Sequence, residues 1–349
     1  MDRSPPSQTP RLRPTVVALG AVAALTLTAC GGGGGASTKA TAAGPSAQST
    51  QGGITLNALW PLTGLRVTGA APKHPPMVVK IDNTASSRPQ LGLAKADLIT
   101  EELVEGGLTR LAVFFDTHVP SLVGPVRSMR ASDIGLVKPV KGLVVTSGAA
   151  APTIARLKTA GVRFASNDGG SPGFFRDSGR AAPYNLLMRL GVLAKTLRQP
   201  TEVTPPYLPW GKESDFNGAA RARSIAARFG SGHTTLWSYQ GGKYVNTNTN
   251  AAPGTAFKAD TVVVVRVGVR DAGYLDPAGH FVPESITTGH GKALVFHNGK
   301  VERGSWSKGG QSHTWAFRTR AGKLKIPAGH TWLEVLPVNA KGGALTFGG

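Results

Sequence analysis

MVVKID, at Met77–Asp82, is a short apolar run rich in β-branched residues, and such a run predicts a buried strand. Comparable runs on its C-terminal side predict strands at Thr109–Thr117 (TRLAVFFDT), Gly142–Ser147 (GLVVTS) and Val162–Ala165. Segments with helical spacing of apolar residues lie among and after them, at Leu93–Val104, Pro152–Ala160, Tyr184–Leu197 and Gly218–Phe229. Strands that alternate with helices indicate an α/β layered domain.

The later part of the chain is rich in β-hairpin signals. Thr261–Val269 (TVVVVRVGV) fits a central strand. Leu294–His297 and Lys300–Arg303 flank Asn298-Gly299, a strong two-residue hairpin signal because both turn positions need φ > 0. We therefore expect an α/β (α+β) fold, with a layered sandwich N-terminal domain over 54–230. A smaller β-hairpin-rich C-terminal domain is expected over 231–340 and a tail over 341–349.

The first fifty residues carry an export signal. Arg11 and Arg13 precede an uncharged, mostly apolar run at Thr15–Ala29, which is shorter than the roughly 20 residues of a spanning helix. Leu27-Thr28-Ala29-Cys30 resembles a bacterial lipobox, which implies cleavage before Cys30 and lipidation of its thiol. The alternative is an ordinary signal peptide with a chance cysteine. We expect a lipoprotein signal peptide over 1–29 and a flexible Gly/Ser/Thr/Ala tether over 30–53.

The composition limits both the class of protein and the partners that it can bind. The 349 residues are 40% hydrophobic, enough for a buried core, and 39 Lys+Arg against 19 Asp+Glu give a net charge of +20. Such a surface attracts polyanions, acidic wall polymers or anionic lipid head groups. A single cysteine excludes an intramolecular disulfide and a Cys-rich zinc site. No nucleotide, zinc-protease or hydrolase motif is present, so no cofactor or metal is expected.

Basic residues predict a site for anions. Residues 82–116 hold six acids and three bases, whereas residues 127–198 hold twelve bases and three acids. Arg127 and Arg130 follow Gly124-Pro125 on a loop after a strand, where α/β folds often bind ligands. Arginine offers a planar fork suited to phosphate or carboxylate. The candidate anion ligands are Arg110, Arg127, Arg130, Arg176 and Arg180. The alternative is that these arginines satisfy buried carbonyls or carboxylates.

Acidic residues are candidates to hold the arginines of the anion site in place. On the predicted helix, Asp97, Glu101 and Glu105 share one face at i, i+4 and i+8, and they form either a solvated face or partners for Arg110 or Arg127. Asp82, Asn83, Glu101 and Glu105 are the candidate supporting or acid/base residues. A metal-carboxylate site has little support, because no Asp-x-Asp loop accompanies them.

Several segments resemble the YerB-like family of bacterial lipoproteins, whose activity is uncharacterised. The segments are Pro61–Leu65, Ile81–Asn83, Arg88–Ile99, Glu101–Arg110, Gly124–Arg130, Arg176–Leu187, Gly291–Trp306 and Gly329–Pro337. They run in order through nearly the whole mature chain. The resemblance implies an α/β layered sandwich. This chain has Tyr184 where the family usually carries His, so a role for an imidazole there does not carry over.

The sequence favours a non-catalytic binding lipoprotein of the cell envelope, held by membrane lipid through Cys30 on the extracytoplasmic face. The expected ligand is an anionic wall polymer, a phosphorylated or carboxylated small molecule, or a glycan; nucleic acid is not expected. Glycan stacking would use Trp306, Trp315 or Trp332, which otherwise pack the β core. The alternative function is a hydrolase or transferase of envelope polymers that uses Asp82, Glu101 or Glu105 as acid or base.

Overall fold

The computed structural model describes residues 49–51, 54–56, 59–198, 200–338 and 342–349. The predicted signal peptide, Cys30 and most of the predicted tether therefore lie outside the described residues. The short strands β1 (Ser49–Gln51) and β2 (Ile54–Leu56) pair with each other, and the remaining elements belong to the same compact unit, Gln48–Gly349.

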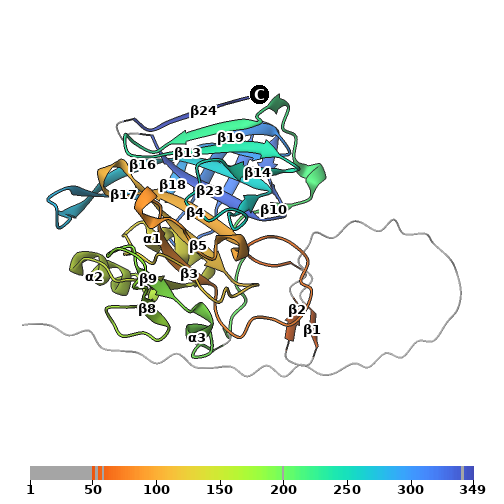
Figure 1. Ribbon diagram of the computed structural model, residues 1–349. Coiled ribbons are helices and arrows are strands. Elements are labelled where there is room, and N and C mark those ends of the chain that lie inside the picture. Colours follow the sequence, from red (N-terminus) through yellow and green to blue (C-terminus); the bar gives the residue numbers. More distant parts are fainter. Residues whose placement is uncertain (1–48, 52–53, 57–58, 199, 339–341) are drawn as a thin grey trace, which may run out of the picture. The chain divides into compact units, whose positions relative to one another are not determined.

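A thirteen-stranded mixed sheet runs through this unit (Figure 1). Its order is β21-β20-β19-β18-β16-β23-β4-β5-β3-β6-β7. Outside this order, β11 pairs with β19 and β17 pairs with β16. The N-terminal strands are β3 (Met77–Asp82), β4 (Leu98–Leu103), β5 (Thr109–Phe115), β6 (Leu143–Thr146) and β7 (Arg163–Ser166). The C-terminal strands are β11 (Ala220–Arg221), β16 (Thr261–Leu275), β17 (Phe281–Ile286), β18 (Gly289–His297), β19 (Lys300–Lys308), β20 (Ala316–Thr319), β21 (Gly322–Leu324) and β23 (Thr331–Pro337).

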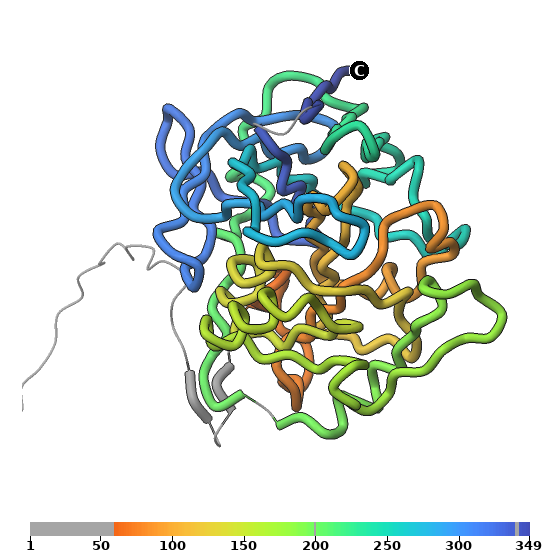
Figure 2. Tube along the Cα trace, turned by 90° about the vertical axis from the view of Figure 1, so that its left-hand side faces the viewer, coloured from red at the N-terminus to blue at the C-terminus, as the bar shows by residue number. Residues whose placement is uncertain are grey.

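A second sheet of five strands packs on the C-terminal half of the large sheet. Its order is β15 (Lys258–Ala259), β14 (Lys243–Asn246), β13 (Thr234–Gln240), β12 (Ser224–Arg228) and β24 (Ala344–Gly348). Trp237 of β13 meets Trp332 of β23 edge to face, with ring centroids 5.0 Å apart. In Figure 2 the C-terminal segments, in blue, fill one half of the molecule, and the yellow-green residues fill the other.

The remaining elements are short. The α-helices of the described part are α1 (Asp133–Val137), α2 (Ala151–Thr159) and α3 (Leu190–Ala194), and they lie in the N-terminal half (Figure 1). Two small sheets pair β8 (Phe174–Arg176) with β9 (Leu186–Met188), and β10 (Trp210–Gly211) with β22 (Ile326–Pro327). The 3₁₀ turns are η1 (Ala85–Ser87), η2 (Leu93–Lys95), η3 (Glu105–Gly107), η4 (Lys138–Val140) and η5 (Glu213–Asp215).

Both faces of the central strands of the large sheet are covered. Side chains alternate between the faces of a strand, so Val79 and Ile81 of β3 enter one apolar cluster and Val78 enters the other. The first cluster also contains Trp332, and the second contains Trp306 and Trp315. These three tryptophans are at most 2% exposed, so they form part of the core and offer no glycan platform.

The structure is mostly β, with several sheets and few helical residues, so the expected balance of strand and helix is only partly right. The strand predicted at Met77–Asp82 is confirmed with the same bounds, and the helix predicted at Pro152–Ala160 corresponds to α2. The helix predicted at Leu93–Val104 is wrong, because η2 and the strand β4 occupy it. All six residues of β4 are buried, so apolar spacing along this segment reflects burial on both faces of a sheet.

Two more helix predictions are wrong. Gly218–Phe229 forms the strands β11 and β12, and Tyr184–Leu197 holds only β9 and the five-residue α3. Ala and Arg are good helix formers, but β12 has partners on both edges in β13 and β24, and sheet pairing overrides that propensity. The large sheet contains strands from both predicted domains, since β23 pairs with β16 and with β4; the boundary at residue 230 stays a prediction.

Candidate functional site

The carboxyl ends of parallel strands meet at one edge of the large sheet, and a loop crosses them there. β3 runs parallel to β6, and both β3 and β4 run antiparallel to β5. The loop 124–130 lies between the ends of β3 and β6. The N–H of Arg127 donates to the carbonyl of Lys80 at 2.9 Å, and the N–H of Ser147 donates to the carbonyl of Arg127 at 3.1 Å. These bonds fix the loop that carries the predicted arginines.

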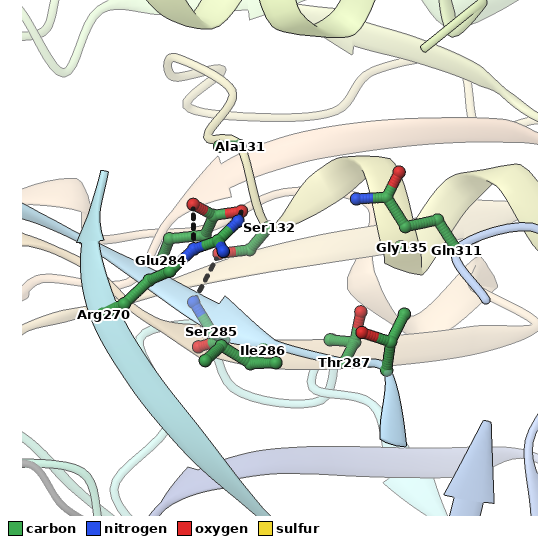
Figure 3. A pocket seen from close by; sticks show the side chains of 10 residues that line it. Ala131, Ser132, Gly135, Arg270, Glu284, Ser285, Ile286, Thr287 and Gln311 are labelled. Atoms are coloured by element: carbon green, nitrogen blue, oxygen red, sulfur yellow. Dashed lines mark hydrogen bonds and ion pairs between the residues drawn. The ribbon is translucent and has the colours of Figure 1, made fainter. Parts of the chain in front are cut away.

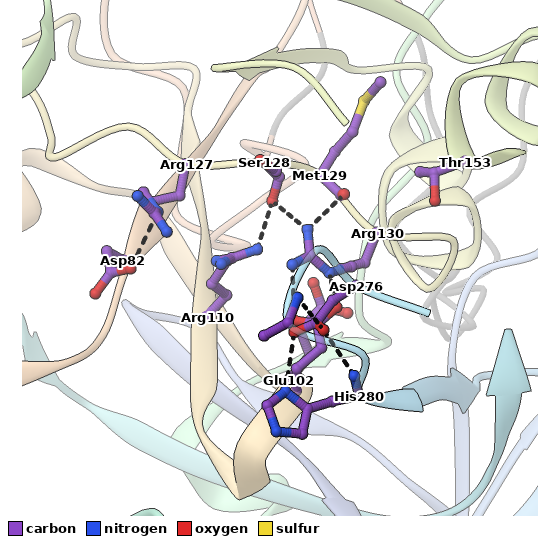
Figure 4. A network of polar contacts seen from close by, with 12 residues as sticks. Asp82, Glu102, Arg110, Arg127, Ser128, Met129, Arg130, Thr153, Asp276 and His280 are labelled. Atoms are coloured by element: carbon purple, nitrogen blue, oxygen red, sulfur yellow. Dashed lines mark hydrogen bonds and ion pairs between the residues drawn. The ribbon is translucent and has the colours of Figure 1, made fainter. Parts of the chain in front are cut away.

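Arg127 is the most exposed arginine of this loop. Its side chain is 23% exposed, its Nε lies 3.3 Å from Oδ2 of Asp82, and its Nη1 donates to the carbonyl of Pro183 at 3.4 Å (Figure 4). The guanidinium also lies 5.4 Å from the ring centroid of Tyr184. Asp82 is itself held by the N–H and hydroxyl of Thr84, at 2.9 and 2.5 Å. Arg127 is therefore oriented on three sides, although its contacts are long.

Arg110, on β5, is buried behind the loop. Its Nη1 donates to the carbonyl of Ser128 at 3.1 Å, and its buried Nε has no hydrogen-bond partner in the described part of the chain. Burial and the charges of Arg130 and Arg127 lower the pKa of Arg110 to about 9, against the opposing effect of Glu105 and Asp82. The guanidinium still carries its proton at pH 7, so it adds a buried positive charge to the site.

Arg130 is neutralised by Glu105. Nε and Nη2 of Arg130 donate to the two carboxylate oxygens of Glu105, each at 2.7 Å, and Nη1 donates to the carbonyl of Met129 at 3.0 Å (Figure 4). Burial favours protonation of Glu105, but the paired guanidinium outweighs it and lowers the pKa of that carboxyl. This fork-to-fork pair is the strong form of the interaction. Glu105 therefore pairs with Arg130, and not with Arg110 or Arg127 as the sequence predicts.

Arg176 and Arg180 lie on the segment 176–185, which also supplies Pro183 and Tyr184 to Arg127. Arg176 donates to the side-chain oxygen of Asn185 at 2.8 Å. Arg180 donates to the carbonyl of Pro89 at 2.9 Å and pairs with Asp177 at 3.3 Å. The structure therefore groups Arg110, Arg127 and Arg130 around the loop, whereas Arg176 and Arg180 have partners of their own.

Glu101 and Asn83 lie in a different polar cluster, on the opposite face of the sheet. Nδ2 of Asn83 donates to Oε1 of Glu101 at 3.0 Å, Nε2 of His233 lies 3.1 Å from the same oxygen, and the hydroxyl of Thr235 donates to Oε2 at 2.8 Å. The expected pairing of Glu101 with Arg110 or Arg127 is wrong, because neighbouring strand residues face opposite ways. Burial alone would raise the pKa of Glu101, but His233 and the hydroxyls lower it.

One buried ionic group was missed at the sequence level. Nζ of Lys80 donates to Oε1 of Glu102 at 2.5 Å and to Oδ1 of Asp133 at 2.7 Å, with all three side chains fully buried. The N–H of Arg130 donates to Oδ2 of Asp133 at 2.7 Å, which joins this group to the loop. Burial and Asp133 raise the pKa of Glu102 to about 7, although Lys80 opposes the shift. A lysine inside MVVKID is the signal that could have indicated it, since a buried lysine needs carboxylate partners.

Other candidate sites are poor. A pocket of about 50 Å³ lies beside β17 and is lined by polar groups that include Ser132, Glu284 and Thr287 (Figure 3). Glu284 already pairs with Arg156 and Arg270, at 2.6 and 2.9 Å, so this pocket offers no free charge. In the residues that the structure describes, no group of three His, Cys, Asp or Glu side chains could hold a metal ion. No helix within those residues is long and apolar enough to cross a membrane.

Comparisons with known proteins match nearly the whole described chain. The model described as “Protein of unknown function (DUF3048) N-terminal domain” matches residues 62–202, and its C-terminal counterpart matches residues 225–333. The chain is 26% identical over 290 residues to “Putative lipoprotein YerB” of Bacillus subtilis (strain 168), covering 79% of this chain and 86% of that protein. The crystal structure of YerB from Bacillus subtilis matches with a TM-score of 0.66 at 22% identity. That match covers 80% of this chain and 96% of the other, and it shows a shared fold.

Proposed function

The chain belongs to the DUF3048 family of proteins of unknown function. We propose that it is a lipid-anchored binding protein of the extracytoplasmic membrane face. Its ligand carries a phosphate or carboxylate group, which docks on Arg127. The observation that carries the proposal is the difference between Arg127 and the two arginines behind it. Arg130 is already satisfied by a carboxylate, Arg110 is buried, and Arg127 is oriented and partly exposed.

Arg127 keeps donors for a ligand. A guanidinium carries five N–H donors. Nη1 of Arg127 donates to the carbonyl of Pro183 at 3.4 Å, whereas its Nε, 3.3 Å from Oδ2 of Asp82, has no hydrogen-bond partner in the described residues. The ring of Tyr184 and the carboxylate of Asp82 fix its plane, so a phosphate or carboxylate would meet a preorganised fork. Preorganisation reduces the entropy lost on binding. A bidentate contact of this kind contributes roughly 1.5–3 kcal/mol.

Electrostatics also favours an anion here. Three guanidinium groups converge on the loop, and Arg110 has one unpaired buried donor. Asp82 and Glu105 neutralise two of the three charges. Repulsion among the three cations is stronger in this partly desolvated region than in water, and a bound anion beside Arg127 would offset it.

The carboxylates favour binding over acid/base catalysis. A general acid near neutral pH needs a raised pKa and access to substrate. Glu105 has a lowered pKa and is locked to Arg130, and Glu101 has a lowered pKa and is fully buried. Glu102, with a pKa raised to about 7, is also fully buried. None of these three glutamates meets both requirements, and Asp82, the remaining acid/base candidate, pairs with Arg127. The hydrolase or transferase alternative therefore has less support.

The proposed lipid anchor is supported by the N-terminal sequence and by the similar protein of Bacillus subtilis. A basic start, a fifteen-residue apolar run and Leu27–Cys30 precede a Gly-rich spacer, and the similar Bacillus subtilis protein carries the word lipoprotein in its name. A two-chain lipid at Cys30 would hold the protein firmly on a membrane surface.

The experiment compares two arginines in similar surroundings. Arg223 also donates to a carbonyl, that of Tyr239 at 3.3 Å, and lies 5.3 Å from the same tyrosine ring, but it pairs with no carboxylate in the described structure. Arg127→Lys and Arg223→Lys both keep the charge and remove the planar fork. Titration with inorganic phosphate distinguishes a site at Arg127 from diffuse attraction by the +20 chain.

A further inference from the structure

The outer strands of the large sheet present a row of cations on one exposed face. On one face of β19, β20 and β21, the side chains of Trp306, Phe317 and Leu324 pack in the core. On the other face, register places Lys292 opposite Ser305, Ser305 opposite Arg318, and Arg318 opposite Lys323, and these four side chains are exposed. Arg303, also exposed, follows on the same face of β19, two residues before Ser305. We call this surface the basic face; its cations are Lys292, Arg303, Arg318 and Lys323.

The basic face has no carboxylate partner within the described residues. Arg303 lies over the ring of Phe347, 5.1 Å from its centroid. Glu302, the acid nearest in sequence, alternates to the other side of β19 and accepts the N–H of Asn217 at 3.0 Å. Arg318 and Lys323 lie directly opposite each other, and like charges in that position destabilise a sheet. The cross-strand pair of Arg318 and Lys323 costs folding free energy, which favours a role for these charges in binding a partner.

We propose that the basic face binds a linear polyanion, a chain with a phosphate or carboxylate in each repeat. Neighbouring strands lie about 4.8 Å apart, so the row from Lys292 to Lys323 crosses three such steps and extends over roughly 14 Å. Ser305 lies within the row between Lys292 and Arg318, and its hydroxyl donates to the carbonyl of Arg318 at 3.5 Å. Lys292 lies two strand spacings from Arg318, and Arg318 lies one spacing from Lys323, so an extended polyanion can contact these cations in turn.

A membrane surface fits this face less well. Faces that dock on a bilayer usually add apolar side chains that enter it. The large apolar side chains that are exposed in the described structure, such as Leu275 and Phe281, lie outside β18–β21. The site is also separate from Arg127, because β16, β23, β4 and β5 lie between β18 and β3 in the sheet. The two binding sites can therefore be tested independently.

The test uses the full chain carrying Cys30→Ser, so that no lipid contributes, and long-chain polyphosphate as the probe. One variant removes the basic face through Lys292→Gln, Arg303→Gln, Arg318→Gln and Lys323→Gln. A control of equal net charge removes four other exposed cations through Lys95→Gln, Lys158→Gln, Lys195→Gln and Arg198→Gln. Melting temperatures verify folding, and the double variant Arg318→Gln/Lys323→Gln replaces the fourfold one if it fails to fold.

The basic-face variant should bind polyphosphate at least tenfold more weakly, and the slope of log K against log salt should fall by about 2–3, since each contact releases counterions. The control should lose less than threefold, and phosphate binding at Arg127 should be unchanged in both. Equal losses in the two variants would overturn the proposal in favour of diffuse charge. Loss of binding to phosphatidylglycerol vesicles with polyphosphate binding intact would overturn it in favour of a membrane partner.

Discussion

Glu101 of β4 and Glu334 of β23 lie directly opposite each other in the large sheet, and both side chains are fully buried. Nε1 of Trp237 donates to Oε1 of Glu334 at 2.8 Å. Burial and the neighbouring Glu101 raise the pKa of Glu334 well above its ordinary value, whereas the pKa of Glu101 is lowered, mainly by His233. Of the two carboxyl groups, Glu334 is therefore the one that keeps its proton to higher pH. The pair links strands that are more than 200 residues apart.

Replacing Glu334 with Gln should stabilise the protein at high pH. A raised folded-state pKa means that wild-type stability is complete below the unfolded pKa and is lost as pH rises toward the folded value. Glutamine does not titrate and still accepts the N–H of Trp237. We expect Glu334→Gln to gain about 1 kcal/mol or more at pH 8, roughly 2–4 °C in Tm, and less at pH 5. Thermal unfolding of wild type, Glu334→Gln and the control Glu302→Gln at both pH values measures this. A lower Tm for Glu334→Gln at pH 8 would show that Glu334 is ionised in the fold.

The Asn298-Gly299 turn should be sensitive to any side chain at Gly299. Both residues have positive φ, +49° and +68°, as the sequence predicts, and a Cβ at Gly299 would lie 2.9 Å from Cδ1 of Tyr239. Gly241, in the β13–β14 hairpin, also has positive φ, but a Cβ there would meet nothing within 4 Å. Gly299→Ala should therefore cost about 1–3 kcal/mol and Gly241→Ala clearly less. Urea unfolding compares the two, and equal losses would mean that Tyr239 yields without cost.

Lipid attachment at Cys30 predicts a simple cellular phenotype. Cys30→Ser should leave unprocessed precursor or release soluble protein, because serine cannot accept the lipid as a thioether. Fractionation and mass spectrometry of the N-terminus measure the outcome, and Cys30→Ala provides a second test without a hydroxyl. Unchanged processing and membrane retention in both variants would rule out this anchor.

The sequence predicts the strands of this fold better than its helices. β3 is confirmed residue by residue, because an isolated β-branched run has few alternatives. The segment that contains β4 has apolar residues at helical spacing, which predicts a helix and gives no sign that Glu101 and Glu102 are buried. Both are fully buried, one with His233 and the other with Lys80. These partners come from distant parts of the chain, so neither the burial nor the strand is visible in the local pattern.

Only part of the candidate site can be predicted from the sequence, because its ion pairs also join residues that are distant in the chain. Gly124-Pro125 followed by two arginines marks the loop, and charge counting suggests that an acid holds it, which Glu105 does. The sequence does not reveal which arginine stays partly exposed, because that depends on which carboxylate reaches which guanidinium. Asp82 and Glu105 are 23 residues apart, and each pairs with a different arginine of one short loop.

The affinity of the protein for inorganic phosphate, measured at two fixed ionic strengths, tests the site at Arg127 most directly. Isothermal titration of wild type, Arg127→Lys and Arg223→Lys, at low and moderate salt, gives the three dissociation constants. We predict that Arg127→Lys weakens binding at least tenfold, as expected for a lost contact of about 1.5–3 kcal/mol, while Arg223→Lys stays within twofold of wild type. Equal affinities for the two variants, with steep loss of binding at moderate salt, would show only diffuse attraction and contradict a site at Arg127.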